Sequence, residues 1–267
     1  MVKKVLTIAG SDPLAAGGLQ ADLATFSEYG LFGLAAITSI VTNVQHDFKI
    51  YPTEVQQLDE QLATIFALPD LEGIKLGLLP TVELIELVGQ YLKESPTKLV
   101  VFDPVLIFKE ANQLDLADLV QAMRTNIFPY ADVITPNLSE AALLANRPVP
   151  TTPTGLLSLA QQIQSDFNGS VVIKGGKRLA GTEAIDLLLD SEQNVHYFEK
   201  TMLNAVTVNG AGCTFAAAIT ANLSLGLNLL GAVEDAKDFV YQGIQAGVPI
   251  ETNLGNVWQG ARRYKQR

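Results

Sequence analysis

The chain has 267 residues, of which 48% are hydrophobic and 17% charged, so it is long enough to bury a large core as a single α/β domain. Its formal net charge of −10 argues against nucleic acid as a partner, because such binding relies on a basic surface that displaces counterions. One cysteine excludes an internal disulfide, and no long apolar run or signal-peptide pattern follows Met1, so we expect a cytoplasmic protein with no membrane partner.

Short apolar runs rich in β-branched residues alternate along the chain with segments of helical periodicity. Strands are expected at residues 5–9, 35–41, 73–76, 99–102, 133–134 and 171–173. Helices are expected around Leu19, Leu23 and Phe26, and at residues 54–66, 81–93, 116–125, 138–145, 154–166, 212–225 and 230–246. The alternation predicts one domain over residues 1–267, with a central, mostly parallel sheet flanked by helices.

A loop of small residues at 209–214, with the sequence NGAGCT, runs directly into one of these helices. Gly210 and Gly212 let the backbone approach a ligand closely, and the free N–H groups at the helix start favour an anion. Cys213 would lie in that positive field, which is expected to lower the pKa of its thiol and make it a candidate base or nucleophile. The alternative is a small buried hydrophobe, because the helix that follows is strongly apolar.

Further segments stand at the ends of predicted strands, where open α/β sheets bind their ligands. They are AGSD at residues 9–12 with QAD at 20–22, DPV at 103–105, TPNLSE at 135–140 and IKGGK at 173–177. Together with the loop at 209–214, these ordered blocks resemble the ribokinase superfamily, in the branch of hydroxymethylpyrimidine kinases and bacterial pyridoxal kinases. The resemblance implies a ribokinase-like three-layer sandwich, with ATP and Mg²⁺ as cofactors and a small vitamer as substrate.

The resemblance also implies a catalytic role for the glycine loop. Cys213 takes the place of the aspartate that other ribokinase-like enzymes use as a base, and would deprotonate the primary alcohol of the substrate as the γ-phosphate arrives. The N–H groups of Gly210, Ala211, Gly212 and Cys213 would stabilise the developing charge. Some relatives carry a second cysteine that traps the aldehyde of pyridoxal, but this chain has Phe108 there, so a plain base role is expected.

Two carboxylates match family positions near the metal and the phosphates. The resemblance implies that Glu140 and Asp103 hold Mg²⁺. Taken alone, Glu140 would be an ordinary carboxylate in the first turn of a helix. Asp103 would be a residue that ends a strand and begins a turn before a proline.

Lys174 matches the family lysine that reaches the nucleotide phosphates as a point charge. Taken alone, it would be a solvated lysine at a strand end, an interpretation that suits Lys177 better. The other candidates for nucleotide binding are Asn137, Thr207, Gly210 and Gly212.

Residues near the first strands are expected to bind the heteroaromatic ring of the substrate. The candidates are Ser11, Asp12, Gly18, Asn43 and Val105. Taken alone, Ser11 and Asp12 would be turn and cap residues before the first helix. Hydroxymethylpyrimidine kinases typically read Ala-Gln-Asn-Thr after the second strand, with the glutamine on the pyrimidine, whereas this chain reads Thr-Asn-Val-Gln at 42–45. The shorter side chain of Asn43 favours a pyridoxal kinase over a hydroxymethylpyrimidine kinase.

Three more expectations concern the lid, the assembly and a different class of function. Residues 105–114 are expected to form a lid that excludes water from the site. Similar proteins are commonly dimeric, so we expect a homodimer by analogy. Asn209 stands where the family usually has histidine, so the alternative from another class is a regulatory protein that binds the vitamer without turnover.

Overall fold

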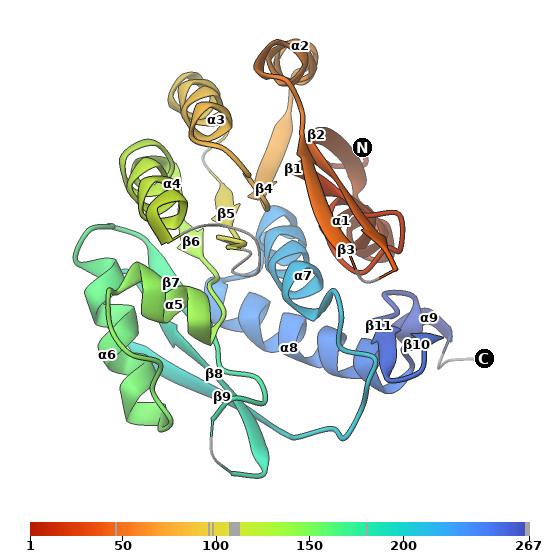
Figure 1. The fold of residues 1–267 in the computed structure, drawn as a ribbon, viewed down its shortest axis with the longest axis vertical. Coiled ribbons are helices and arrows are strands. Elements are labelled where there is room, and N and C mark those ends of the chain that lie inside the picture. Colours follow the sequence, from red (N-terminus) through yellow and green to blue (C-terminus); the bar gives the residue numbers. More distant parts are fainter. Residues whose placement is uncertain (46, 96, 98, 107–112, 180, 265–267) are drawn as a thin grey trace.

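The computed structural model describes residues 1–45, 47–95, 97, 99–106, 113–179 and 181–264. Nine strands form one sheet in the order β3-β2-β1-β4-β5-β6-β7-β8-β9, and β10 and β11 form a separate hairpin (Figure 1). The strands are β1 (Lys4–Ser11), β2 (Phe32–Val44), β3 (Asp47–Pro52), β4 (Leu71–Leu76), β5 (Val100–Phe102), β6 (Val133–Ile134), β7 (Ser170–Lys174), β8 (Glu183–Leu189), β9 (Val195–Thr201), β10 (Val248–Glu251) and β11 (Leu254–Asn256).

The middle of the sheet is parallel and its two ends are antiparallel. Strands β2, β1, β4, β5, β6 and β7 pair in parallel, while β3 pairs antiparallel with β2, and β8 and β9 extend the other end as an antiparallel pair. All six predicted strands are confirmed and all lie in the parallel part. The fold class, a mostly parallel sheet between helices, is confirmed as well.

Helices cover both faces of the sheet. They are α1 (Gly18–Glu28), α2 (Val55–Phe66), α3 (Val82–Glu94), α4 (Gln113–Asn126), α5 (Leu138–Leu144), α6 (Pro153–Gln164), α7 (Ala211–Leu225), α8 (Leu229–Gln245) and α9 (Ala261–Tyr264), with a 3₁₀ turn η1 (Phe128–Tyr130). In Figure 1, α2 to α6 lie along one side of the sheet and α1, α7 and α8 along the other. None of the described helices is long and apolar enough to cross a membrane.

Each face of the sheet has its own apolar core, and the parallel strands contribute to both. In β5, Val100 and Phe102 pack into the core with α2 to α6, whereas Val101 between them packs against α7 and α8. A strand buried on both faces needs apolar residues at successive positions, because side chains alternate between faces. This explains why the continuous apolar runs of the sequence mark these strands.

The strands that sequence reasoning missed are the antiparallel ones. β9 alternates exposed and half-buried residues along its length, as expected for a strand with one face toward solvent. β3 is almost entirely exposed or half-buried at the opposite edge of the sheet. β3 and β9 lack the continuous apolar run on which the predictions relied, whereas β8 ends in three consecutive buried leucines that were not recognised as a strand.

Candidate active site

A cavity of about 510 Å³ opens where β5, β6 and β7 end and α7 begins. The carboxyl ends of parallel strands and a helix N-terminus meet there, which is the usual ligand site of an open α/β sheet. The predicted site residues that line it are Asp103, Val105, Asn137, Glu140, Lys174, Gly210, Ala211, Gly212 and Cys213. The sequence blocks around these residues, far apart along the chain, therefore converge on one site.

The glycine loop brings the start of α7 to this cavity. Gly210 adopts a left-handed backbone conformation with φ of 81°, which favours glycine. A Cβ on Gly212 would lie 3.2 Å from Nζ of Lys174, so the absence of a side chain lets the lysine approach the helix start. Helix geometry leaves the first N–H groups of α7 without intrahelical partners, and with the helix dipole they favour an anion at this point.

Cys213 lies in the first turn of α7 and faces the start of α1. A Cβ on Gly17 would stand 3.4 Å from Sγ, and the N–H of Gly18 donates a hydrogen bond to the sulfur. The pKa of the thiol is raised from 9.0 to about 11, because burial and the negative charges of Asp103 and Asp22 together outweigh the lowering effects of Lys75 and the Gly18 N–H. The predicted lowering of this pKa is therefore wrong.

The electrostatic reason could not be read from the local sequence. A helix N-terminus does favour a thiolate, but Asp103 reaches Cys213 from β5 and Asp22 from α1. Two carboxylates and the partial burial of the thiol outweigh the helix start and one lysine. With this pKa, Cys213 is a neutral thiol at neutral pH.

Asp103 and Lys174 form an ion pair across the ends of β5 and β7. Nζ of Lys174 lies 2.6 Å from Oδ1 of Asp103, and both side chains are mostly buried. The carboxylates of Asp103 and Glu140 raise the pKa of Lys174, although burial acts in the opposite direction. The lysine is therefore charged and fixed at the cavity wall.

Glu140 and Asn137 form a capping box at the start of α5. The side chain of Asn137 accepts from the N–H groups of Ser139 and Glu140 at 2.9 and 3.1 Å, and Oε2 of Glu140 accepts from the N–H of Asn137 at 2.7 Å. Burial, followed by the charge of Asp103, raises the pKa of Glu140 to about 7, while Lys174 lowers it. Asn137 and Glu140 therefore cap α5 and also line the cavity. A role of Glu140 at the start of the helix is thus compatible with a role as a metal ligand.

The remaining predicted residues do not line this cavity. The side chain of Ser11 accepts a hydrogen bond from Gln20, and the carboxylate of Asp12 accepts one from the N–H of Leu14, as the turn-and-cap alternative expects. Asn43 is exposed near the end of β2, paired with Phe48 of β3.

Gly18 and Thr207 also have structural partners. Gly18 has φ of +58°, and a Cβ there would come within 2.2 Å of the carbonyl oxygen of Gly10, so only glycine fits. Thr207 is buried, and its hydroxyl donates to the carbonyl oxygen of Ile244 at 2.7 Å. The predicted lid lies mostly outside the described residues, since only its first two residues and its helical end are described.

Sequence reasoning missed an ion pair beneath the site. Nζ of Lys75 lies 2.8 Å from Oδ2 of Asp22, and both side chains are fully buried. The hydroxyl of Thr7 donates to the same carboxylate oxygen at 2.6 Å. Burial lowers the pKa of Lys75, but the charges of Asp22 and Asp103 outweigh it and raise the pKa above its usual value. The signal for this site is a lysine within the otherwise apolar end of β4, which reads Gly-Ile-Lys-Leu.

A second missed pair lies in the wall of the cavity. Nζ of Lys237 donates to Oδ2 of Asp186 at 2.8 Å and to the carbonyl oxygen of Ala184 at 2.9 Å. The other carboxylate oxygen of Asp186 accepts from the N–H of Gly175 at 3.0 Å. The pair thus ties α8 to the turn after β7.

Further along α8 the cavity wall becomes apolar. Val240, Tyr241 and Ile244 follow Lys237 at helical spacing and line the cavity, opposite Val208 and other apolar residues. The cavity therefore combines a charged end, at Asp103 and Lys174, with an apolar end that suits a flat ring.

The fold and this site together define a ribokinase-like α/β kinase, and comparison with known proteins supports the class. The family model of phosphomethylpyrimidine kinase matches residues 12–258. Pyridoxine kinase of Bacillus subtilis is 38% identical over 267 residues, which are 99% of this chain and 98% of that protein. A hydroxymethylpyrimidine/phosphomethylpyrimidine kinase of Haemophilus influenzae is 35% identical over 98% of both chains. The chain belongs to the phosphomethylpyrimidine kinase family.

Solved structures agree with this assignment. The ADP complex of Bacillus subtilis pyridoxal kinase superimposes with a TM-score of 0.93 at 37% identity, covering 98% of this chain and 99% of that one. Pyridoxal kinase from Staphylococcus aureus in complex with AMP-PCP and pyridoxal gives a TM-score of 0.92 at 36% identity, covering 98% and 95%. The expected kinship with the ribokinase superfamily is confirmed.

Proposed function

We propose that this protein transfers the γ-phosphate of ATP to the 5′-hydroxymethyl group of pyridoxal. The observation that carries the proposal is the convergence of Cys213 and the α7 N-terminus with Lys174, Asp103 and Glu140 on one cavity. Relatives named pyridoxine kinase, and solved structures that bind pyridoxal and ATP analogues, support the substrate and the nucleotide.

The two ends of the cavity suit the two ends of ATP. The apolar wall of α8, with Val240 and Ile244, would hold the adenine ring. Lys174 and the free N–H groups of Gly212 and Cys213 would bind the phosphates, because they place positive charge where the γ-phosphate must be transferred. Positioning and charge neutralisation would supply most of the rate acceleration.

Asp103 and Glu140 fit the role of magnesium ligands. Two carboxylates shared with substrate phosphates are the usual protein environment of Mg²⁺. The raised pKa of Glu140, about 7, reflects burial beside another carboxylate, a repulsion that a divalent cation would relieve. When bound, the metal would neutralise charge on the phosphates.

Cys213 would accept the proton of the substrate alcohol. Its thiol must first release its own proton to solvent, and the pKa of about 11 makes the thiolate rare at neutral pH. The N–H of Gly18 and the charge of Lys75 both favour the thiolate. Val105, at the cavity wall, would contact the vitamer ring.

The proposal is tested by measuring ADP release with Mg·ATP and either pyridoxal or hydroxymethylpyrimidine as acceptor, for the wild type and Cys213→Ala. Turnover of pyridoxal that collapses in the variant supports both the substrate and the base. Turnover of the pyrimidine alone would instead support a hydroxymethylpyrimidine kinase, the activity for which the relative from Haemophilus influenzae is named. Nucleotide binding without ADP release with either acceptor supports the regulatory alternative.

We also propose that the chain acts as one kinase domain and forms a homodimer. The single nine-stranded sheet supports one domain. Exposed apolar side chains on β2 and β3, including Phe32, Ile40 and Tyr51, support self-association, because such groups are stabilised when a second copy covers them. Light scattering during size-exclusion chromatography would give the mass of a dimer, and a monomer mass would contradict this.

A further inference from the structure

The positive charges of the cavity are unequally available to a ligand. Among the described residues, the cations that line it are Lys174, Lys177, Arg178, Lys200 and Lys237. Three of them are paired with carboxylates: Lys174 with Asp103 at 2.6 Å, Lys200 with Asp238 at 2.5 Å and Lys237 with Asp186 at 2.8 Å. Their charges are already largely compensated within the protein.

Lys177 and Arg178 are bonded to neutral groups instead. Nζ of Lys177 donates to the carbonyl oxygen of Ala205 at 3.0 Å. The guanidinium of Arg178 donates to Oδ1 of Asn137 at 3.3 Å and to the hydroxyl of Ser139. In a protein with a net charge of −10, these two side chains supply the uncompensated positive charge of the described cavity wall.

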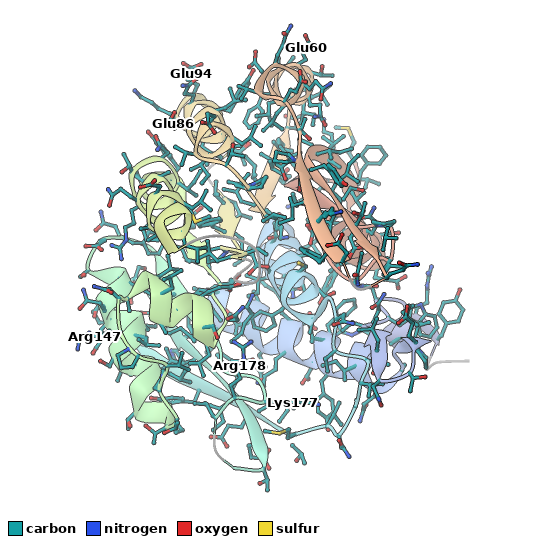
Figure 2. The ribbon with its side chains drawn as sticks, in the orientation of Figure 1. Glu60, Glu86, Glu94, Arg147, Lys177 and Arg178 are labelled. Carbon is teal, nitrogen blue, oxygen red and sulfur yellow. The ribbon has the colours of Figure 1, made fainter. Side chains whose placement is uncertain are left out.

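The position of Arg178 relates it to the charged end of the cavity. It belongs to the turn after β7, three residues beyond Gly175, and reaches across to the first turn of α5. Figure 2 shows its side chain near α5, apart from Arg147. The same turn of α5 carries Glu140, whose carboxylate approaches the N–H of Leu106 just beyond Asp103. Lys177 points the other way, toward the segment after β9.

The present partners of Arg178 are both neutral, and one of them is shared with other donors. Oδ1 of Asn137 already accepts the N–H groups of Ser139 and Glu140, so its contact with Arg178 is a third and longer bond. Hydrogen bonds between an arginine and a phosphate are charge-assisted and commonly bidentate, and are roughly twice as strong as those between neutral groups. The residue is exposed, so it can exchange partners without a large desolvation cost.

We propose that Arg178 is a phosphate-binding residue, which leaves Asn137 and Ser139 and binds the β- or γ-phosphate when the nucleotide enters. This inference rests on the proposed nucleotide site. Arg178 thereby links the turn after β7 to the nucleotide at the end of the cavity where transfer takes place. Its planar fork also suits the tetrahedral array of phosphate oxygens better than a lysine would.

The test compares the affinities of Arg178→Gln and the wild type for Mg·ATP and for AMP by calorimetry, with no acceptor present. We expect the variant to bind Mg·ATP about 10- to 100-fold more weakly, the usual range for hydrogen bonds to a charged group, and AMP almost unchanged. Arg178→Lys should recover part of the loss, and Arg147→Gln, a matched change of an exposed arginine, should bind ATP like the wild type. Unchanged ATP affinity in Arg178→Gln, or an equal loss for ATP and AMP, overturns the proposal.

A second variant tests the exchange of partners. Ser139→Ala removes the neutral acceptor of Arg178, so the ligand-free protein loses a competing contact and ATP affinity should rise about two- to fivefold. The same change in the Arg178→Gln background should have no effect. A gain in both backgrounds, or a loss in the wild-type background alone, contradicts the exchange.

Because these measurements need no phosphoryl acceptor, they separate the two proposals. A wild type that binds ATP but does not phosphorylate pyridoxal refutes the proposed substrate, and the comparison of variants still decides the role of Arg178. A wild type that does not bind ATP overturns both.

Discussion

The buried pair Lys75–Asp22 offers a prediction that can be worked out in detail. Both side chains are fully buried, Nζ lies 2.8 Å from Oδ2, and the other oxygen of Asp22, Oδ1, has no hydrogen-bond partner in the described structure. Replacing the lysine by methionine keeps the length of the side chain and removes the charge. A carboxylate in an apolar interior is then left with only the hydroxyl of Thr7.

Removing one partner of a buried ion pair costs about 3 to 5 kcal/mol, because the remaining charge stays desolvated. We therefore expect Lys75→Met to lower the free energy of unfolding by about that amount, and Asp22→Asn to lower it by a similar amount. The double variant leaves neither charge buried, so it should recover most of the loss. Gly77 is kept as glycine in these three variants, because a Cβ at that position would lie 2.9 Å from Nζ of Lys75.

Urea unfolding at neutral pH, followed by circular dichroism, measures these differences. The four proteins of the cycle should show a coupling of more than about 2 kcal/mol between the two positions. Single variants within about 1 kcal/mol of the wild type, or a double variant as unstable as the sum of the singles, would refute the reasoning.

Two further predictions concern the glycine and cysteine that meet at the start of α1. Gly18→Ala should destabilise the fold by several kcal/mol, because φ is +58° and a Cβ would lie 2.2 Å from the carbonyl oxygen of Gly10. The control Gly30→Ala, where φ is +73° and the space around the Cβ is open, should cost only about 1 kcal/mol; thermal melts compare the two. Equal costs would contradict the steric argument. The rate of alkylation of Cys213, the only cysteine, should be slow at neutral pH and should increase with pH up to the pKa of about 11. The folding stability relative to Cys213→Ser should fall between pH 9 and about 11, because the thiol ionises at a lower pH in the unfolded chain. Rapid alkylation at pH 7 would show that the thiolate is already present.

The parallel part of the fold could be predicted because burial on both faces leaves a continuous apolar run. Leu99 to Phe102 and Val171 to Ile173 are such runs, and β5 and β7 lie there. The antiparallel strand β8 ends in three consecutive buried leucines and carries the same signal, although it was not recognised, whereas β9 could not be found in this way. β9 reads Val-His-Tyr-Phe-Glu-Lys-Thr, in which polar and apolar residues alternate because one face meets solvent.

The parts of the site that are formed by residues close together in the sequence could be predicted. The parts that depend on residues from distant segments were missed. The glycine loop and the Asn137–Glu140 capping box are local patterns, and the structure places both at the cavity. The pKa of Cys213 depends instead on burial by the surrounding fold and on the charges of Lys75, Asp103 and Asp22, which come from separate parts of the chain. No local pattern of the sequence contains that arrangement, so the direction of the shift was wrong.

Local sequence also could not tell which polar residues face the cavity. Thr207 is adjacent to Val208, which lines the cavity, yet its own hydroxyl turns to the carbonyl of Ile244. Asn43 lies near the end of β2, next to the edge strand β3, and no residue of β2 lines the cavity. Asn43 was proposed because it stands where hydroxymethylpyrimidine kinases have a glutamine, and such a match does not say which way the side chain faces.

The central claim, phosphoryl transfer to a B6 vitamer, is tested most directly by competition. Pyridoxal and hydroxymethylpyrimidine at equal concentration are incubated with Mg·ATP and the wild-type protein, and the phosphorylated products are identified by mass spectrometry. The account predicts that phosphorylated pyridoxal dominates and that Cys213→Ala produces almost none. Predominant phosphorylation of the pyrimidine, or undiminished turnover by Cys213→Ala, would contradict it.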